Sequence, residues 1–397
     1  MLEILLGGVR GLLSARFYSA VHRQGFFSFK RCEGQGLGLK VVKYLLMRWK
    51  GFIFRRPYLV LLALLLGCVP SLPTPELPKE VVEAERLRQR KLALFAYLDR
   101  LERLLRVSDR LLIAASPFCK DQRPVFGFSV HDRTCYREED LGLLSERFRI
   151  GDGITVWYVH PELPAGVAGL RPNDRILKVN SREPRGIKEF VEVLRSSYEL
   201  ELVVEREGEV LHLRVQAQRG CNCEVHLVQD DSLNAWAAPG GKVYVTTGLM
   251  RFIHDEDELA FVLGHELSHH VLGHLAKRTV NVLLGTLLDV LVSGVSGVPT
   301  RGVFQQLGAL VFSEEFEKEA DYLGTYLAAR AGYDVRKAPD FWRRMAVEFP
   351  QAISKAFLAT HPSTPERFTL VEKAVEEIER KRQTGEELVP TKLKKHP

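Results

Sequence analysis

The feature that most constrains the fold is the motif His265-Glu266-Leu267-Ser268-His269, because it lies in a stretch with the pattern of a helix. Asp255 and Glu258 form a D-x-x-E capping box at the start of this stretch. After the box, apolar residues recur at the three-to-four spacing of a buried helical face: Leu259, Val262, Leu263, Leu267, Val271 and Leu272. The sequence therefore predicts a buried helix that carries the motif.

Positions i and i+4 of a helix lie one turn apart on the same face, so His265 and His269 can direct both imidazoles at one metal ion. Glu266 is rotated by about 100° from His265 and would lie beside the metal. That is the place for a general base that acts on a metal-bound water. The alternative is a surface helix that carries histidines by chance, which the apolar frame and an acidic segment downstream disfavour.

A catalytic zinc site has three protein ligands and one open position, so a third ligand is needed for the one Zn²⁺ expected per chain. The segment 313–324 starts a helix, and Glu317 is the candidate ligand. Asp321 shares the helical face of Glu317 and could hydrogen-bond the far nitrogen of a ligand histidine, which would fix its tautomer. The carboxylates of Glu315 and Glu319 are expected in solvent. The imidazoles of His270 and His274 are expected in supporting or structural roles.

Residues 234–250 predict a β-hairpin that turns at Pro239-Gly240-Gly241. An edge strand beside a metal cleft is a suitable clamp for the backbone of an extended substrate. We therefore expect a substrate-binding set in this hairpin: Asn234, Ala235, Trp236, Pro239, Gly240 and Gly241. A hairpin that only supports the helix is the alternative, and both roles are compatible.

Residues 149–219 resemble a bacterial PDZ domain, through the pattern A-G-L-x-x-x-D-x-I-L-x-V that begins at Ala168. Asn173 stands where that family usually has glycine, and asparagine is the next best residue at a left-handed turn. The resemblance implies a β-rich domain that binds a peptide by strand addition beside its helix, with a carboxylate-binding loop near 149–153. A purely structural or docking module is the alternative.

Four separated motifs occur in the order seen in the zinc peptidases that include CAAX prenyl proteases, HtpX and BepA. They are NAWAAPGG from Asn234, GHELSHHVLGH from Gly264, E-x-x-x-D from Glu317, and THPSTPER from Thr360. The resemblance implies a gluzincin-type endopeptidase with zinc ligands His265, His269 and Glu317 and the base Glu266. His361 in the last motif could stabilise the oxyanion or cap the open zinc position, or its loop could be purely structural.

The expected fold is α+β, with a mainly helical zincin-type metallopeptidase domain at 220–382 and the β-rich PDZ-like domain before it. The peptidase domain should contain a small β-hairpin sheet. The chain shows no array of spanning helices, so it resembles the soluble, envelope-facing branch of the family. Residues 280–302 are apolar but interrupted by glycines and Asp289, too interrupted to span a bilayer. This segment is interpreted as a lid over the cleft, a partner or membrane-surface contact, or a buried core helix.

The N-terminal residues have the pattern of a targeting signal. Residues 47–67 form a signal peptide, and Leu65-Leu66-Gly67-Cys68 resembles a bacterial lipobox, in which Cys68 would be lipidated. Residues 1–46 are interpreted as an over-extended start or, from their basic composition, as an organellar presequence. A Pro-rich tether follows at 69–79. The predicted location is the bacterial envelope, as a lipid-anchored protein that faces the periplasm, with a mitochondrial location as the alternative.

Residues 80–148 comprise a long helix with an apolar stripe at 80–115 and an irregular or β-containing connection. The helix is expected to pack on a domain, with a coiled-coil dimer as the alternative. If the chain is exported, Cys119 could pair with Cys135, and Cys221 or Cys223 could form another disulfide, although reduced thiols are equally compatible. The net charge of +6 is modest, and basic residues gather near the N-terminus and in the disordered tail 383–397, so no nucleic-acid site is predicted.

These patterns predict zinc-dependent hydrolysis of peptide bonds, with protein or peptide substrates and a PDZ domain that binds or regulates them. By analogy with the family, the clients would be misfolded or mis-assembled envelope proteins. The competing class is a lipid-anchored chaperone or assembly factor whose metal site is largely silent. Glu266 argues against that class, because a structural site needs no base beside an open position.

Overall fold

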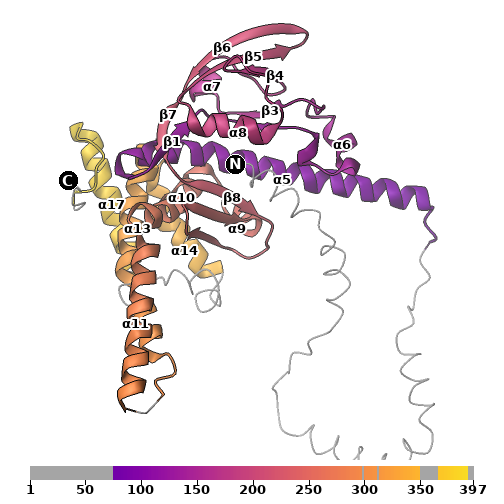
Figure 1. Cartoon of the computed structure of the whole chain (residues 1–397). Helices are drawn as coiled ribbons and strands as arrows, with labels where there is room; N and C mark the ends of the chain where they lie inside the picture. Colours follow the sequence, from indigo (N-terminus) through magenta and orange to yellow (C-terminus); the bar gives the residue numbers. More distant parts are fainter. Residues whose placement is uncertain (1–74, 297–298, 311–312, 349–364, 392–397) are drawn as a thin grey trace, which may run out of the picture. The chain divides into compact units, whose positions relative to one another are not determined.

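The computed structural model describes residues 75–296, 299–310, 313–348 and 365–391 (Figure 1). Contacts divide the described residues into two units, residues 75–90 and the residues from Lys91 onward, and the second unit holds all the described sheets. Several expectations lie outside the described residues: the signal peptide, the lipobox cysteine Cys68, most of the tether, His361 and the end of the tail.

The PDZ-like part is a five-stranded sheet with the order β2-β3-β4-β5-β6. Its strands are β2 (Phe128–His131), β3 (Thr155–Val159), β4 (Arg175–Val179), β5 (Glu199–Arg206) and β6 (Glu209–Gln216). The turn between β5 and β6 uses Glu207 and Gly208, both with positive φ, which suits the twist of a two-residue hairpin. Asn173 has φ of 72°, as its left-handed position requires.

Helices α6 (Glu138–Leu144), α7 (Pro164–Val167) and α8 (Ile187–Ser196) complete this part. Helix α8 buries Ile187, Phe190, Val191 and Leu194, which recur at helical spacing. Strand β2 lies before the domain start expected at 149, because α6 and a 3-10 turn (Arg133–Cys135) are inserted between β2 and β3. The insertion hides the pairing of these two strands from the sequence pattern.

The second part combines a three-stranded sheet with helices. The sheet has the order β8-β10-β9, formed by β8 (Glu224–Val228), β10 (Lys242–Thr246) and β9 (Ala235–Ala238). β10 runs parallel to β8 and antiparallel to β9, so the predicted hairpin is present and β9 is an edge strand of this sheet. The helices are α9 (Thr247–Phe252), α10 (Glu256–Val271), α11 (His274–Ser296), α12 (Val303–Leu310), α13 (Ser313–Arg330), α14 (Ala338–Glu348) and α17 (Pro365–Thr384).

Helix α10 lies at the centre of this part, between the sheet and α13. Twelve of its residues are buried, from Glu258 to His269, so the apolar frame of the motif is part of the core. The α+β class expected from the sequence is confirmed, with a mainly helical domain and a β-rich one.

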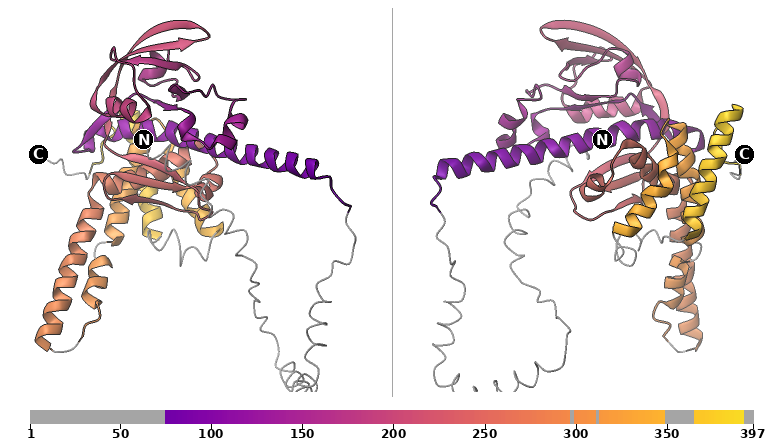
Figure 2. Two further views of the ribbon diagram at one scale, coloured as in Figure 1. Left: turned by 45° about the vertical axis from the view of Figure 1, so that its right-hand side comes forward. Right: turned by 180° about the vertical axis from the view of Figure 1, so that it is seen from behind.

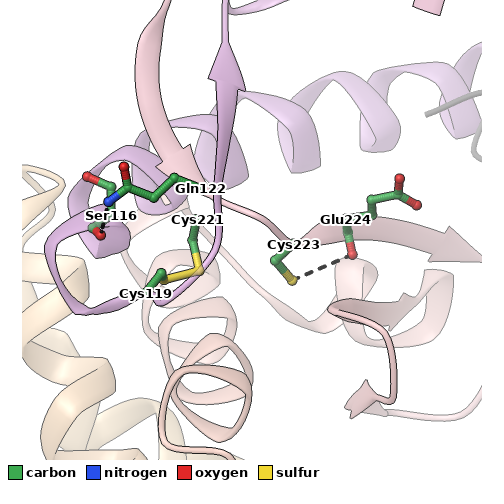
Figure 3. The surroundings of a disulfide bond; sticks show 6 residues. All are labelled: Ser116, Cys119, Gln122, Cys221, Cys223 and Glu224. Carbon is green, nitrogen blue, oxygen red and sulfur yellow. Dashed lines mark hydrogen bonds between the residues drawn. A yellow bond between two sulfur atoms is a disulfide. The ribbon is translucent and has the colours of Figure 1, made fainter. Parts of the chain in front are cut away.

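Helix α5 (Lys79–Ala115) buries one stripe of its length from Leu94 to Ala115 in the same core. It leads through the 3-10 turn Ser116–Phe118 into β1 (Gln122–Val125), which pairs with β7 (Gln218–Cys221). A disulfide joins Cys119 to Cys221, with Cys223 nearby (Figure 3). Cys135 and Cys223 are free and buried. The pairing of Cys119 with Cys135 is therefore wrong, because the β1–β7 pairing brings together cysteines 102 residues apart.

Helices α11 and α12 lie side by side in all views (Figure 1, Figure 2). The expectation that glycines interrupt this segment is wrong, since α11 is one continuous helix through Gly285 and Gly294. Among the described residues, His274–Val295 is the one helix that is long and apolar enough to cross a membrane, and only 11% of its most apolar window is buried.

Candidate active site

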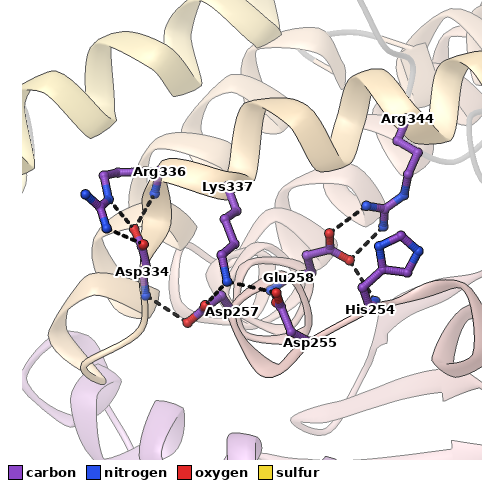
Figure 4. Close-up of polar contacts among 8 residues, drawn as sticks. All are labelled: His254, Asp255, Asp257, Glu258, Asp334, Arg336, Lys337 and Arg344. Atoms are coloured by element: carbon purple, nitrogen blue, oxygen red, sulfur yellow. Dashed lines mark hydrogen bonds and ion pairs between the residues drawn. The ribbon is translucent and has the colours of Figure 1, made fainter.

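The N-terminus of α10 is held in place by a cluster of ion pairs (Figure 4). The Asp255 carboxylate accepts a hydrogen bond from the Glu258 backbone N–H, as a helix cap does. Glu258 accepts one from the His254 backbone N–H and one from each terminal guanidinium nitrogen of Arg344, at 2.7 Å. Lys337 bridges Asp255 and Asp257. The carboxylates also interact favourably with the positive end of the helix dipole, so this end of α10 is held in a fixed position.

A contact between two glycines brings α10 and α13 together. A Cβ atom on Gly264 would lie 2.6 Å from the carbonyl oxygen of Gly324, and one on Gly324 would lie 2.6 Å from the backbone nitrogen of His265. The helices can approach this closely only because neither residue has a side chain. The crossing lies next to His265, and α13 carries Glu317 two turns before Gly324.

Three buried side chains converge at this crossing: His265, His269 and Glu317. The Nε2 atoms of the two histidines lie 3.1 Å apart. The Glu317 oxygens lie 3.3 Å from His265 Nε2 and 3.5 Å from His269 Nε2. Ligands about 2.0–2.1 Å from a tetrahedral zinc ion are separated by about 3.3 Å, so this donor set fits the ion.

Asp321 fixes the orientation of the first histidine. Its Oδ1 lies 2.8 Å from His265 Nδ1, so the Nδ1–H donates to the carboxylate and Nε2 is the ring nitrogen available to a metal ion. Asp321 is fully buried, and the Arg367 guanidinium donates hydrogen bonds to both of its carboxylate oxygens, at 2.6 and 2.8 Å. Arg367 also lies 3.3 Å from Glu317 and stacks over the Trp342 ring.

The second histidine is oriented by a chain of two residues. His269 Nδ1 lies 3.0 Å from His274 Nδ1, and His274 Nε2 lies 2.9 Å from the Glu319 carboxylate. Because Glu319 accepts only, the His274 proton is on Nε2, and its Nδ1 accepts from His269 Nδ1–H. Burial lowers the pKa of His274, which favours this neutral form. His269 Nε2 is then unprotonated and able to bind a metal.

The electrostatics of the cluster favour a cation. Burial opposes charge on His265, but the carboxylates of Asp321 and Glu317 outweigh it and raise the pKa of His265 to about 10. Burial also opposes charge on Asp321, but Arg367 and His265 hold the pKa of that carboxyl below its usual value. Glu266 is fully buried on α10, one residue after His265. Buried carboxylates gathered around two imidazoles are the donors that zinc prefers.

The expected substrate-binding residues lie along β9 and its turn. Ala235 is fully buried, and the Trp236 ring stacks on Tyr244 across the strand pair, with ring centres 5.2 Å apart. The side-chain oxygen of Asn234 is buried, and no donor among the described residues reaches it. Pro239 and Gly240 are exposed at the turn.

Gly241 connects this turn to the motif helix. A Cβ atom on Gly241 would lie 3.2 Å from His270 Cε1, so the turn lies against the end of α10. Strand β9 itself contacts α10. The hairpin is thus beside the helix that carries His265 and His269, with its free edge on β9.

The PDZ groove differs from the expectation at one end. The strand edge beside α8 is β2, and the rings of Phe128 and Phe190 meet edge to face at 6.2 Å. The loop that leads into β2 is Phe126-Gly127, with Gly127 at φ 79°, whereas residues 149–153 lie shortly before β3.

Other elements of the same unit cover this groove. Residues of β2 and α8 line a cavity of about 50 Å³ together with Ser108 and Leu112 of α5 and Val225 of β8. That space holds a few water molecules. A peptide could therefore occupy the groove only after α5 and β8 moved away from it.

Sequence reasoning missed three contributors to the site, namely Arg367, the Gly264–Gly324 contact and Glu319, whereas His274 was expected in the supporting role that it has. Arg367 stands at the end of the last motif, and that position was the only signal for it. Glu319, expected in solvent, is 55% exposed yet its carboxylate contacts His274. Glu315 and Glu319 are four residues apart and so lie on the same face of the helix. The sequence pattern alone therefore gave no reason to expect a contact for one and not for the other.

Comparisons with known proteins find matches to both the peptidase part and the PDZ-like part of the chain. Residues 201–375 match the model of peptidase family M48, and residues 155–206 match the PDZ domain. The mitochondrial metalloendopeptidase OMA1 of Schizosaccharomyces pombe is 34% identical over 167 residues, which cover 41% of this chain and 50% of the relative. The beta-barrel assembly-enhancing protease of Yersinia pestis is 33% identical over 159 residues, which cover 36% of this chain and 32% of the relative.

The chain thus spans half or less of the length of these relatives. Among solved structures, the HtrA3 PDZ domain bound to a phage-derived ligand is 24% identical and aligns with a TM-score of 0.21. The alignment covers 25% of this chain and 88% of that one.

Proposed function

We propose that this chain, which carries a peptidase family M48 domain and a PDZ domain, is a zinc-dependent metalloendopeptidase. The observation that carries the proposal is the convergence of His265, His269 and Glu317 beside the buried carboxylate of Glu266. Two imidazoles and one carboxylate are the ligand set of catalytic zinc sites that keep one position open.

Zinc, when bound, would polarise the scissile carbonyl and lower the pKa of a water molecule towards about 7. His265, His269 and Glu317 would hold the ion, while Asp321 and the His274–Glu319 pair orient the two imidazoles for metal binding. Glu266 takes the proton of the attacking water and passes it to the leaving amine. Arg367 neutralises the charge of Asp321 and Glu317 without entering the reaction.

We further propose that His361 stabilises the oxyanion or caps the open zinc position. This role rests on its place in the THPSTPER motif. His361→Ala should lower turnover, zinc affinity or both. A variant with unchanged turnover and unchanged zinc affinity would leave His361 with a structural role only.

The substrate backbone is proposed to lie along the β9 edge, where a peptide can add as a further strand. The position of the β9 edge beside α10 supports this. The side-chain oxygen of Asn234 is buried, so it would have to turn outward to accept from a substrate N–H. Ala235 and Trp236 would form the strand that pairs, and Pro239-Gly240-Gly241 the turn at its end. The PDZ domain would bind client peptides or regulate access to the site.

The proposed clients are misfolded or mis-assembled proteins of the bacterial envelope, with the chain held there by a lipid on Cys68. Similarity to a beta-barrel assembly-enhancing protease supports the envelope, and the Cys119–Cys221 disulfide is suited to an oxidising compartment. Similarity to mitochondrial OMA1 proteins supports the alternative location in mitochondria.

Cleavage of unfolded casein by the full chain tests the peptidase activity. The wild type should cleave casein, a chelator should abolish cleavage, and added zinc should restore it. Glu266→Gln should lower the rate by at least about 10³-fold, because the general base is lost. The matched control is Glu256→Gln, which removes a carboxylate from the first turn of the same helix, away from the cluster. Bound zinc without cleavage by the wild type would favour the chaperone or assembly factor.

A further inference from the structure

The helix pair α11–α12 forms a distinct structural feature, called the apolar hairpin below and defined by residues 278–295 and 303–307. The two helices pack at close range, since a Cβ atom on Gly285 would collide with the carbonyl oxygen of Phe304. Figure 1 and Figure 2 show the pair extending away from the sheets. The hairpin is therefore a packed pair of helices and not an irregular loop.

The outer surface of the hairpin is apolar over an unusually wide arc. At about 100° per residue, the exposed apolar positions of α11 cover about 200° of its circumference. They are Val280, Leu283, Leu284, Leu287, Leu288, Val290, Leu291, Val292 and Val295, and α12 adds Val303 and Leu307. A helix that faces water shows polar residues over such an arc. This surface is thus suited to an apolar medium.

Three polar side chains of the hairpin, those of Thr286, Asp289 and Ser293, have hydrogen-bond partners on the hairpin or next to it. The Asp289 carboxylate is buried and accepts from the backbone N–H groups of Phe304 and Gln305, which caps α12. The Thr286 hydroxyl donates to the Val282 carbonyl. Ser293 and Thr300 bond to each other. Internal pairing of this kind is what a hydrocarbon environment demands of a polypeptide, whereas water would satisfy these groups without it.

Exposed charge is confined to the two ends of the hairpin. Asp289 is the only charged residue in the sequence between Arg278 and Arg301. Lys277 and Arg278 are exposed at the end near the catalytic cluster, and Arg301 is exposed at the far end. The rise from Arg278 to Ser296 is about 27 Å, close to the hydrocarbon thickness of a bilayer, about 30 Å. Basic residues at such positions complement anionic headgroups.

We propose that the apolar hairpin inserts into a lipid bilayer that contains anionic lipids. Helix α11 begins at His274, which contacts the ligand histidine His269, so insertion holds the metal cluster at the membrane surface. The position of a metal cluster at the membrane surface rests on the proposed function. It means that the peptidase would act on substrate segments that emerge next to the bilayer.

The test places an environment-sensitive fluorescent amino acid at Leu291 in the full chain and adds vesicles of phosphatidylcholine and phosphatidylglycerol. We expect a blue shift and quenching by nitroxides on the acyl chains. The control position is Val210 of β6, which is 56% exposed against 53% for Leu291 and should show neither effect. The probe reports on the hairpin itself, even if the N-terminal apolar segment also binds vesicles.

A second comparison uses two triple variants that carry the Leu291 probe. Leu283→Ser, Leu284→Ser and Leu287→Ser should weaken insertion of the probe at least about tenfold. Val167→Ser, Val210→Ser and Val347→Ser remove exposed apolar side chains elsewhere and should leave insertion unchanged.

A Leu291 probe that stays in water with vesicles present would overturn the proposal. So would a probe that is shielded without lipid as protein concentration rises, since a second copy would then cover the hairpin. Shielding that requires an added client protein and no lipid would likewise overturn it. Casein cleavage measured on the same samples shows separately whether the peptidase is active.

Discussion

Gly264 and Gly324 lie back to back where α10 crosses α13, and this contact sets the distance between the two helices that carry His265, His269 and Glu317. A methyl group on either glycine would have to displace backbone and not merely a flexible side chain. The donor cluster and the helix packing are therefore one structural feature.

Gly324→Ala should push the helices apart, lower the free energy of unfolding by about 1–3 kcal/mol and weaken zinc binding. Urea unfolding and a zinc titration measure the two effects. Gly142→Ala is the control, because Gly142 lies in helix α6 with open space around its Cα. Equal behaviour of the two variants would show that the crossing tolerates a methyl group.

Arg367→Lys keeps a positive charge but loses the bidentate hydrogen bonding to Asp321. Because both partners are buried, we expect the free energy of unfolding to fall by about 3–5 kcal/mol. Arg343→Lys alters an exposed pair with Asp340 and Glu372 and should cost about 1 kcal/mol or less. Chemical denaturation of both variants checks the difference, and a small effect at Arg367 would contradict a role in holding the site.

Glu319→Ala should weaken zinc binding about 10–100-fold, since His274 would no longer hold His269 in the metal-binding tautomer. Glu315→Ala, one turn earlier on the same helix and exposed, should leave zinc affinity unchanged. Competition with a chromogenic chelator measures both dissociation constants. If both variants bind zinc like the wild type, the orientation of His269 does not depend on this pair.

His131 makes the fold sensitive to acid. Burial lowers the pKa of His131 to about 3, against about 6.5 in the unfolded chain. As the pH falls, the unfolded state therefore binds the proton at a higher pH than the folded state does. The contribution of neutral His131 to stability is complete above pH 6.5 and is lost as the pH falls towards 3. The loss from this residue should reach about 2 kcal/mol at pH 5.

The comparison of pH 7 with pH 5 in urea unfolding checks this dependence. His131→Gln leaves an acceptor for the Tyr136 hydroxyl but no titratable group, so this variant should lose less stability at pH 5 than the wild type. His212→Gln, on the exposed face of β6, should follow the wild type. An unchanged pH dependence in His131→Gln would assign the acid sensitivity to other groups.

The sequence predicted what depends on local spacing. His265 and His269 are one helical turn apart, Asn173 occupies a left-handed turn, and the hairpin at Pro239-Gly240-Gly241 follows from its turn residues. Each of these needs only a few neighbouring residues, and periodicity reports them directly.

Long-range relationships could not be read in the same way. The Cys119–Cys221 disulfide and the Gly264–Gly324 contact join segments that become neighbours only in the fold. Strand β2 was expected only as part of an irregular or β-containing connection and was not assigned to the PDZ-like sheet, because an inserted helix separates it from β3. For residues 280–302 the apolar pattern was visible, but periodicity does not say whether an apolar surface faces a core or a bilayer.

The most direct test of the central claim measures zinc content and casein cleavage on the same samples of full-length wild type, Glu266→Gln and His269→Ala. The proposal predicts one zinc per chain in the wild type and in Glu266→Gln, little zinc in His269→Ala, and cleavage by the wild type alone. Cleavage by Glu266→Gln at the wild-type rate, or a wild type that cleaves without binding metal, would contradict it.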